Sequence, residues 1–309
     1  MRYAFIHWER ARYPLTLLCQ VLQVSRSGYY AFLKGRFTAP DHAMCAQVRR
    51  LHAASRCTYG QRRLCQALRA EGVCVGRWRT RTLMRHAGVS VKPKRPWVPR
   101  TTDSRHGEPV APNRLDRQFT IERPNRVWGS DITYLPTQDG WLYLAVVVVV
   151  DLFSRKIVGW AMASTMETSL VARALTMAIG RRHPPPGLLH HSDRGSQYAS
   201  QTYQALLQRH HMIGSMSRRG NCWDNAVVER VFRSVKHEGL GDTAKEQPSE
   251  TVKSTVIDYM EMFYNSHRLH STLGYLSPNA VEAQAQGLTP QPVGTRGGDL
   301  SMPDEEIVR

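Results

Sequence analysis

The alternation of hydrophobic and polar positions predicts a mixed α/β domain in the second half of the chain. Three apolar, strand-like runs cover residues 126–136, 140–154 and 155–163 and follow one another through short turns. Such hairpin connections make the three strands antiparallel. Helical and strand-like periodicities then alternate over residues 165–240, which predicts a mixed sheet with helices on both faces. The run 142–150 is apolar on both strand faces, so we expect it at the centre of the sheet.

Helical periodicity dominates the first third of the chain. Residues 14–33 predict two helices joined by a turn, with Ser25 as the N-cap of the second. A helix-turn-helix and a plain helical hairpin fit this pattern equally well. A second helical unit covers residues 42–90, where Gly72 and Gly88 are expected to end two helices. Small all-helical domains are therefore predicted ahead of the sheet.

Charge separates these two regions. The chain carries a net charge of +17, and residues 1–115 hold 22 Lys/Arg against 5 Asp/Glu, whereas residues 116–309 hold 20 of each. On one predicted helix of the basic region, Arg77, Arg81 and Arg85 share a face. Stacked like charges repel one another, and DNA phosphates would relieve that repulsion. The pattern therefore favours a DNA-binding surface over a merely solvated face.

The patterns divide the chain into six segments. A Pro-rich, basic stretch separates the helical part from the sheet and is expected to lie along DNA or across a partner subunit. The predicted segments are 1–40 (helix-turn-helix-like), 41–90 (basic helix-turn-helix domain), 91–124 (Pro-rich basic linker), 125–245 (α/β core), 246–286 (helical extension) and 287–309 (disordered tail).

Several protein classes are disfavoured. The apolar run 142–150 has nine residues, whereas a membrane helix needs about 20. The N-terminus lacks the charged, apolar and small-residue order of an export signal. The six cysteines show neither Cys-x-x-Cys pairs nor zinc-finger spacing, so reduced thiols are expected. We therefore expect a cytoplasmic, nucleoid-associated protein with no membrane partner.

Two acidic residues occupy positions in the predicted sheet where a binding site could form. Asp131 lies inside the first strand, on one face with Gly129 and Thr133. A buried, unpaired carboxylate in mid-strand is costly and therefore rare. Asp193 ends a later strand just before Gly195, a position that often builds a site beside a sheet. The ordinary alternative for Asp193 is a helix N-cap.

The stretch "GNCWDNAVVERVFRSVKHE" adds a third acid, on a helix. Asp224 stands where the helix begins and is expected to cap it. Glu229 lies about 140° further round the helix and cannot share the face of Asp224. Arg233 and Lys236 follow Glu229 on the same stripe. An ordinary surface salt bridge between Glu229 and Arg233 would produce the same pattern.

Together, the three acids predict a metal site. Between Asp131 and Asp193 lie 61 residues, and between Asp193 and Glu229 lie 35. Three carboxylates that converge on one edge of a sheet repel one another unless a cation is present. Magnesium prefers such oxygen ligands, and two ions can activate an attacking oxygen and stabilise a leaving oxygen on phosphorus.

Five ordered blocks resemble an insertion-sequence transposase of the IS-three family, specifically its downstream reading-frame product. The blocks are "WGSDITYL", "LYLAVVVVVDLFSRKIVGW", "HSDRGSQY", "GNCWDNAVVER" and "YNSHRLHSTLGYLSP". The core of this family belongs to the retroviral-integrase-like group with an Asp, Asp, 35, Glu signature. The stretch "YGQRRLCQALRAEGVCVGRWRTRTLMRHAG" is similar to the helix-turn-helix segment ahead of that core. The resemblance covers most of the chain.

The resemblance implies a ribonuclease-H-like fold and DNA cleavage followed by strand transfer. Carried over by position, Asp131, Asp193 and Glu229 are the catalytic residues and the metal ligands, for two Mg²⁺ ions that Mn²⁺ can replace. Lys236 matches the basic residue of the family seven positions after the glutamate. With Arg233, it is expected to contact DNA near the reacting phosphate.

The resemblance also implies partners. These are double-stranded DNA, both as the terminal inverted repeats of the element and as target, and the upstream reading-frame product, often joined to this chain by frameshifting. A homodimer or higher multimer on DNA is expected.

From the residues alone, two other functions stay open. One is a metal-dependent nuclease of the same fold that cuts without joining, and the other is a non-catalytic DNA-binding regulator with structural acids. Asp151 is interpreted either as a support of the site or, preferably, as the ordinary ion-pair partner of Arg155.

Overall fold

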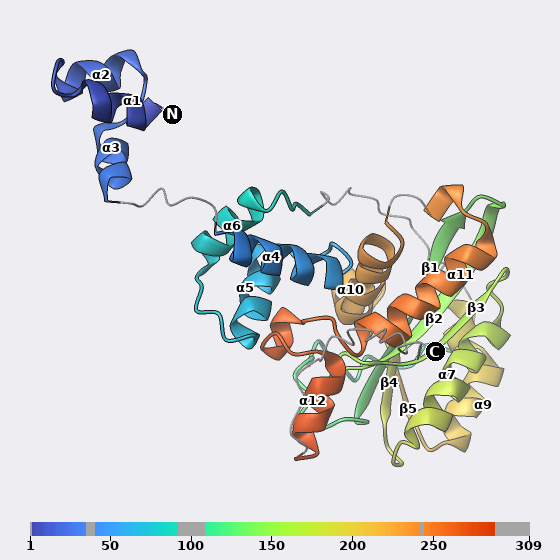
Figure 1. Ribbon diagram of the computed structural model, residues 1–309. Coiled ribbons are helices and arrows are strands. Elements are labelled where there is room, and N and C mark those ends of the chain that lie inside the picture. Colours follow the sequence, from blue (N-terminus) through green and yellow to red (C-terminus); the bar gives the residue numbers. More distant parts are fainter. Residues whose placement is uncertain (1, 35–40, 92–108, 242–243, 288–309) are drawn as a thin grey trace, which may run out of the picture. The chain divides into compact units, whose positions relative to one another are not determined.

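The computed structural model forms two compact units, Met1–Val91 and Lys92–Arg309 (Figure 1). Half of the predicted linker and nearly all of the predicted tail lie outside the residues that the structure describes. Among the described residues, no helix combines the length and the apolar character needed to cross a membrane. The described residues are 2–34, 41–91, 109–241 and 244–287.

Three short helices open the first unit: α1 (Arg2–Glu9), α2 (Leu15–Val21) and α3 (Arg26–Leu33). The last two confirm the predicted pair, and the Ser25 hydroxyl accepts the Gly28 N–H at 3.0 Å as the predicted cap. The sequence pattern did not indicate α1, which contributes Ile6 to a small core with Leu18 and Tyr29.

Three further helices follow: α4 (His42–Ala54), α5 (Gln61–Ala70) and α6 (Arg77–His86). Gly72 and Gly88 adopt positive φ angles directly after α5 and α6, which confirms the predicted helix ends. On α6, Leu83 is buried, whereas Arg77, Arg81 and Arg85 are all exposed. The predicted basic face is therefore accessible to a ligand.

The second unit is built on a five-stranded sheet in the order β3-β2-β1-β4-β5. Strands β1, β2 and β3 are antiparallel neighbours, as predicted, and β4 and β5 run parallel to β1. The central strand is β1; the valine-rich β2 lies one place from the centre, contrary to expectation. The strands are β1 (Val127–Thr137), β2 (Gly140–Asp151), β3 (Ile157–Ala163), β4 (Leu189–Ser192) and β5 (Ile213–Met216).

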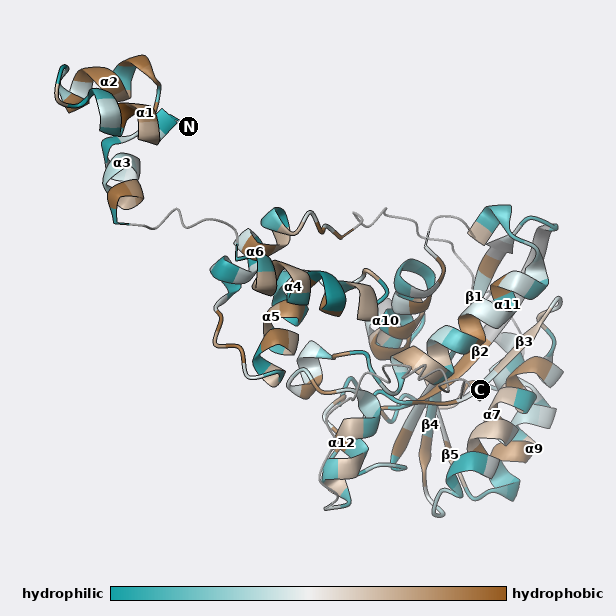
Figure 2. Cartoon of the chain, in the orientation of Figure 1, coloured by the Kyte–Doolittle hydropathy of each residue, from teal (hydrophilic) through white to brown (hydrophobic). Residues whose placement is uncertain are grey.

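The valine run is nevertheless buried on both faces. Residues 147–150 are all fully buried, and β2 is strongly hydrophobic in Figure 2. This agrees with a strand that has a neighbouring strand at each edge and helices over each face.

Helices cover both faces of the sheet (Figure 1). Helix α7 packs on β2 and β3, and α10 packs on β1. Gly159 of β3 faces α7 and is aligned, across β2, with Ser130 of β1. Gly129, the residue before Ser130, faces α10. Because neighbouring residues of a strand point to opposite faces, α7 and α10 lie on opposite sides. The helices of this unit are α7 (Thr168–Arg182), α8 (Ser196–Ala199), α9 (Gln201–Arg209), α10 (Ala226–Ser234), α11 (Ser249–Asp258) and α12 (Pro278–Ala285).

Irregular helical turns interrupt two segments that were predicted as continuous helices. A π-helical turn, Val235–Leu240, continues α10, and a second one, Tyr259–Tyr264, continues α11. The wider π turn changes the angular spacing after Ser234, so the 100° rule no longer places Lys236. Three 3₁₀ turns complete the described elements: Cys222–Asn225, Ala244–Glu246 and Ser271–Leu273.

Asp151 forms its ion pair with Arg182 of α7, at 3.5 Å, so the predicted pair with Arg155 is wrong. Its carboxylate also accepts the N–H groups of Asn125 and Phe153. Arg182 in turn binds Glu282 of α12, which ties the C-terminal helix to the core. Asp151 therefore belongs to a structural network behind the end of β2.

Asp224 does not cap α10, contrary to expectation. The helix begins after Asn225 without a side-chain cap, and the Asp224 carboxylate is buried instead among Asn113, Arg117 and Arg218. It accepts one hydrogen bond from the Asn113 amide at 3.0 Å, one from Arg117 Nε at 3.0 Å, and three from Arg218 at 2.8–3.0 Å. This carboxylate thus joins the segment before β1 to the start of α10.

Substitution of Asp224 by Asn should lower the free energy of unfolding of the second unit by about 2–3 kcal/mol at neutral pH, because it removes charge-assisted hydrogen bonds. Arg218 first, and then Arg117, hold the pKa of Asp224 well below its ordinary value of 3.8. The contribution is therefore present above that pH and is lost as the pH falls below it. Urea unfolding in neutral and in acidic buffer measures both effects.

The matched control for this prediction is Asp116→Asn, which removes an exposed carboxylate 3.2 Å from Arg218. An exposed pair of this kind contributes about 0–1 kcal/mol. A difference between wild type and Asp224→Asn that stays constant into acid would contradict the assigned role.

Substitution of Gly159 by Ala should destabilise the second unit by about 1–3 kcal/mol, because the new methyl group would press on the Ala174 carbonyl oxygen and on Ala178. The control is Gly180→Ala on α7, the helix that carries Ala174 and Ala178; there the methyl group meets open space. That change should stabilise the helix by about 0.5–1 kcal/mol. Equal effects of both changes on urea unfolding would argue against close packing of β3 on α7.

Candidate active site

Strand register brings Asp131 level with Asp193. The parallel pairing of β1 with β4 aligns Val127 with Leu189 and Gly129 with His191. Asp131 lies two residues after Gly129, and Asp193 lies two residues after His191, directly past the end of β4. Both acids therefore lie toward the same end of this strand pair, and the charge of Asp193 raises the pKa of Asp131.

Two contacts place the third acid near them. The α10 side chain Val228 packs onto Gly129, where an added Cβ atom would lie 2.7 Å from its Cγ2 atom. One residue before the helix, Asn225 donates from its amide nitrogen to the Ser130 carbonyl oxygen at 3.1 Å. These contacts hold the first turn of α10, with Glu229, close to the strand that carries Asp131.

Electrostatic effects show that the three acids share one neighbourhood. Burial raises the pKa of Asp131 well above its ordinary value, and the charges of Asp193 and Glu229 raise it further. The Ile132 N–H and the Lys236 ammonium act in the opposite direction. Asp131 therefore resists ionisation unless additional positive charge is present.

The pKa values of Glu229 and Lys236 are shifted by the same two effects, burial and neighbouring charge. Partial desolvation raises the pKa of Glu229, which Arg233 lowers and Asp193 raises. Burial lowers the pKa of Lys236 to about 8, against the opposing effect of Asp131. Lys236 is half-buried and Arg233 is exposed. Of the predicted DNA contacts, Lys236 thus lies next to the acids and Arg233 is accessible to solvent.

Asp193 orients the turn that follows β4. Its Oδ1 atom accepts the Gly195 N–H at 3.0 Å. The N-cap of α8 is Gly195, so the alternative interpretation of Asp193 as the helix N-cap is wrong. One carboxylate oxygen is held by the main chain, which fixes the direction of the side chain.

The donor set of this cluster fits hard divalent cations. All three candidate ligands are carboxylates, the oxygen donors that Mg²⁺ prefers, and a cation would remove their mutual repulsion. In the conformation described, no three His, Cys, Asp or Glu side chains among the described residues are gathered closely enough to form a ligand group. The acids are therefore neighbours without forming a closed cage.

Sequence reasoning missed two supports of this site. No role was assigned to Asn225 from the sequence, yet its amide holds α10 on β1. Tyr198 of α8 is buried, with its hydroxyl 3.0 Å from the Ser130 hydroxyl. Burial first, and then the charges of Asp193 and Asp131, raise the pKa of this phenol. The amide next to a helix start was a usable signal, whereas nothing in the local sequence indicated the tyrosine.

Comparison with known proteins agrees with this architecture. Residues 121–222 and 211–278 match two family descriptions of an integrase core domain, and residues 41–97 match an HTH-like domain. With the mixed sheet described above, the integrase core match confirms the predicted ribonuclease-H-like fold class.

Solved structures show weaker likenesses. The HTLV-2 integrase catalytic core domain in complex with magnesium is 18% identical, with 52% of this chain and 97% of that chain covered and a TM-score of 0.42. A simian T-cell lymphotropic virus intasome in complex with PP2A regulatory subunit B56 gamma is 15% identical, with 85% and 80% covered and a TM-score of 0.42. Similarities at this level add nothing to the assignment.

Curated relatives decide the family. The insertion element IS600 uncharacterized 31 kDa protein of Shigella sonnei is 41% identical over 85% of this chain and 96% of its own length. The transposase InsF for insertion sequence IS3A of Escherichia coli (strain K12) is 40% identical over 91% of this chain and 98% of its own length. The chain therefore belongs to the IS3 family of insertion-sequence transposases, enzymes of transposition and DNA integration with a retroviral-integrase-like core.

Proposed function

We propose that Asp131, Asp193 and Glu229 are the catalytic carboxylates of this transposase and hold its divalent cations, two Mg²⁺ ions that Mn²⁺ can replace. One observation carries the proposal. Asp131 of the central strand is half-buried, and the charges of Asp193 and Glu229, from separate segments of the chain, raise its pKa beyond the effect of burial. Such an arrangement is unfavourable for folding, because each acid increases the cost of ionising the others.

The residues of the chain bind and orient the reacting groups. When bound, the cations supply Lewis-acid stabilisation of the attacking and leaving oxygens of a phosphodiester. Asp131 is held by the rigid central strand, Asp193 by the Gly195 N–H, and Glu229 by the first turn of α10. Asp131, Asp193 and Glu229 would hold such cations beside the phosphodiester, and the proposed cutting by water and joining by a DNA 3′-hydroxyl would then need no covalent protein intermediate.

Lys236 and Arg233 are proposed to hold the DNA near the reacting phosphate. With a pKa of about 8, Lys236 is mainly charged at neutral pH, and it lies beside Asp131. Arg233 is exposed one turn after Glu229. A phosphate at this position would accept hydrogen bonds from both cations.

The basic face of α6 is proposed to bind DNA at the ends of the insertion element. Arg77, Arg81 and Arg85 are exposed on a helix whose other side packs into the HTH-like domain. Guanidinium groups bind phosphates and guanine edges alike. The proposed ligand is double-stranded DNA of the terminal inverted repeats.

Further partners are proposed from the reaction itself. Both ends of the insertion element and the target DNA must be held in one complex, so the chain is proposed to act as a homodimer or higher multimer on DNA. It is also proposed to work with the upstream reading-frame product, separately or as a frameshift fusion. Its location would be cytoplasmic and nucleoid-associated, where that DNA lies.

Removal of any one carboxylate should abolish cleavage and joining. We expect Asp131→Asn, Asp193→Asn and Glu229→Gln each to lower the rates of both steps by about 10³-fold, or roughly 4 kcal/mol, because each takes away part of the cation stabilisation. Labelled end DNA with Mg²⁺ measures cleavage, and pre-cut ends measure joining.

Metal binding provides an independent measurement on the same variants. Electron paramagnetic resonance of Mn²⁺ should show two bound ions per wild-type chain and fewer in each variant. The control is Glu122→Gln, an exposed acid of the same unit. Full activity in one carboxylate variant would remove that residue from the proposed site.

The arginine face of α6 can be tested separately. Substitution of Arg77, Arg81 and Arg85 together by Gln should weaken binding to end DNA and lower the slope of log affinity against log salt by about 0.9 for each lost phosphate contact. The control is His86→Gln, an exposed change on the same helix. An unchanged slope would show that α6 does not face the DNA backbone.

A further inference from the structure

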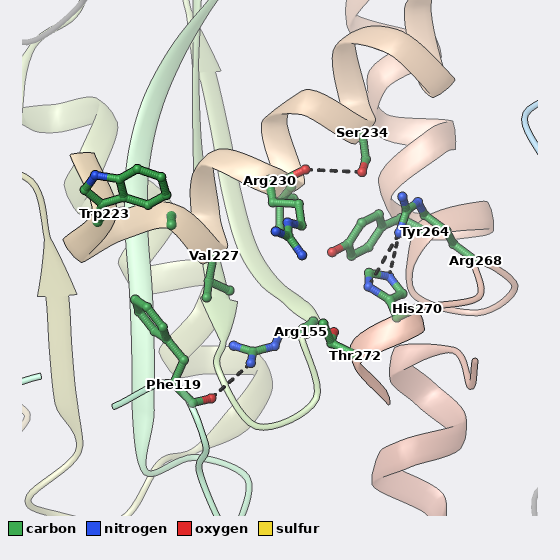
Figure 3. A pocket seen from close by; sticks show the side chains of 12 residues that line it. Phe119, Arg155, Trp223, Val227, Arg230, Ser234, Tyr264, Arg268, His270 and Thr272 are labelled. Carbon is green, nitrogen blue, oxygen red and sulfur yellow. Dashed lines mark hydrogen bonds between the residues drawn. The ribbon is translucent and has the colours of Figure 1, made fainter. Parts of the chain in front are cut away.

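A second site lies on α10, away from the face that carries Glu229. A cavity of about 360 Å³ is lined by five residues of this helix, among them Arg230 and Ser234. On a regular helix Arg230 points about 100° and Ser234 about 140° away from Glu229. The cavity therefore does not belong to the carboxylate cluster (Figure 3).

The residues that line the cavity carry positive charge and no negative charge. Of its twelve lining residues, three are arginines and none is acidic. Glu238 pairs with Arg268, at 2.6 and 2.8 Å. Arg230 is exposed and forms no ion pair with any residue that the structure describes. Arg155 and Arg230 therefore leave two positive charges facing the same space.

Arg155 is the most constrained of these groups. Its Nη2 atom donates to the Phe119 carbonyl oxygen at 3.0 Å, whereas Nη1 is buried and has no hydrogen-bond partner among the described residues. Burial lowers the pKa of Arg155; the nearby charge of Arg230 acts in the same direction, whereas Tyr264 and Asp151 oppose it. A buried guanidinium nitrogen without an acceptor is costly, and an anion in the cavity would supply one.

The turn between β2 and β3 holds Arg155 in this place. Its φ angle is +61°, in the left-handed region that an arginine seldom adopts. The turn is closed by the Asp151 N–H on the Lys156 carbonyl oxygen at 2.9 Å, and the Ser154 hydroxyl donates to Glu282 at 2.8 Å. The strained residue is thus positioned by its neighbours and presents its guanidinium group to the cavity (Figure 3).

Aromatic rings complete the site. Phe119 and Trp223 lie at one end of the cavity, and Tyr264 and His270 lie at the other (Figure 3). Trp223 is 68% exposed, although it is a large apolar side chain on an ordered 3₁₀ turn. An exposed indole beside two arginines offers a stacking surface for a base next to donors for a phosphate.

We propose that this cavity binds a backbone phosphate of the DNA substrate other than the scissile one, with the adjoining base stacked on Trp223. Arg155 Nη1 and the Arg230 guanidinium donate to the phosphate oxygens. The proposal rests on DNA being the substrate of the enzyme, and it does not depend on which acids bind metal. Because Glu229 and Arg230 are neighbours on one helix, occupancy of the cavity would help to set the position of the DNA over the carboxylates.

A carboxylate-bearing peptide is the main competing ligand. Arginines alone would suit it equally well, but a carboxylate does not use an exposed indole at the cavity mouth. The combination of a two-arginine anion site with a flat aromatic surface favours a nucleotide.

The test measures DNA binding by the full chain in EDTA, in a Glu229→Gln background, so that neither metal nor cleavage takes part. Labelled end DNA, both duplex and with an unpaired terminal overhang, is titrated at several salt concentrations. Arg230→Gln should weaken binding about tenfold and reduce the salt slope by about 1. Trp223→Ala should weaken binding about 5- to 100-fold without changing the slope.

Arg155→Asn is the second charge variant, because Asn tolerates the left-handed backbone of this turn. It should weaken DNA binding and reduce the salt slope as much as Arg230→Gln does. The double variant should reduce the salt slope by about 2. The matched control is Arg209→Gln, an exposed arginine on α9 at the other face of the sheet, which should leave the slope unchanged.

Unchanged DNA affinity and salt slope in Arg230→Gln, with the fold intact, would overturn the proposal. So would selective loss of binding to an oligo-glutamate peptide in the same variant, which would assign the cavity to an acidic protein segment. Either result leaves the carboxylate assignment untouched, because cleavage is not measured here. Inactive carboxylate variants that still show the full salt slope would equally leave this proposal standing.

Discussion

The close approach of α10 to the central strand is the contact on which the site depends. Gly129 lets Val228 lie directly on β1, and the Asn225 amide fixes the start of the helix on the Ser130 main chain. A larger side chain at residue 129 would push the helix outward and separate Glu229 from Asp131. The parallel pairing of β1 with β4 brings Asp131 and Asp193 to the same end of the sheet. The contact of α10 with β1 then decides whether Glu229 lies near them.

Acids of one residue type behave in opposite ways in this structure because their surroundings differ. Asp131 is half-buried beside two other acids, and its pKa is raised. Asp224 is fully buried but receives hydrogen bonds from two arginines, and its pKa is lowered. The first arrangement costs folding free energy and is expected where a bound cation offsets the cost. The second stabilises the fold and belongs to the framework of the site.

Helix α10 serves two different surfaces. One face carries Glu229 toward the acids, and another carries Arg230 toward a cavity whose lining residues have positive charge and no negative charge. If DNA binds as proposed, this one helix couples the position of the DNA to that of Glu229, the proposed catalytic carboxylate. The strained turn at Arg155 and the network of Asp151, Arg182 and Glu282 hold the opposite wall of that cavity.

The sequence by itself determined the succession of strands and helices, the antiparallel order of the first three strands and the acids worth testing, since these follow from local periodicity and spacing. Tertiary structure decided that β1 and not β2 is central, that a π turn interrupts the helix before Lys236, and that Asp151 binds Arg182. It also decided that Asp224 joins residues 107 and 111 positions away instead of capping a helix. Local patterns specify which face of an element is apolar, but the partner of a buried charge is set by packing between segments far apart in the chain.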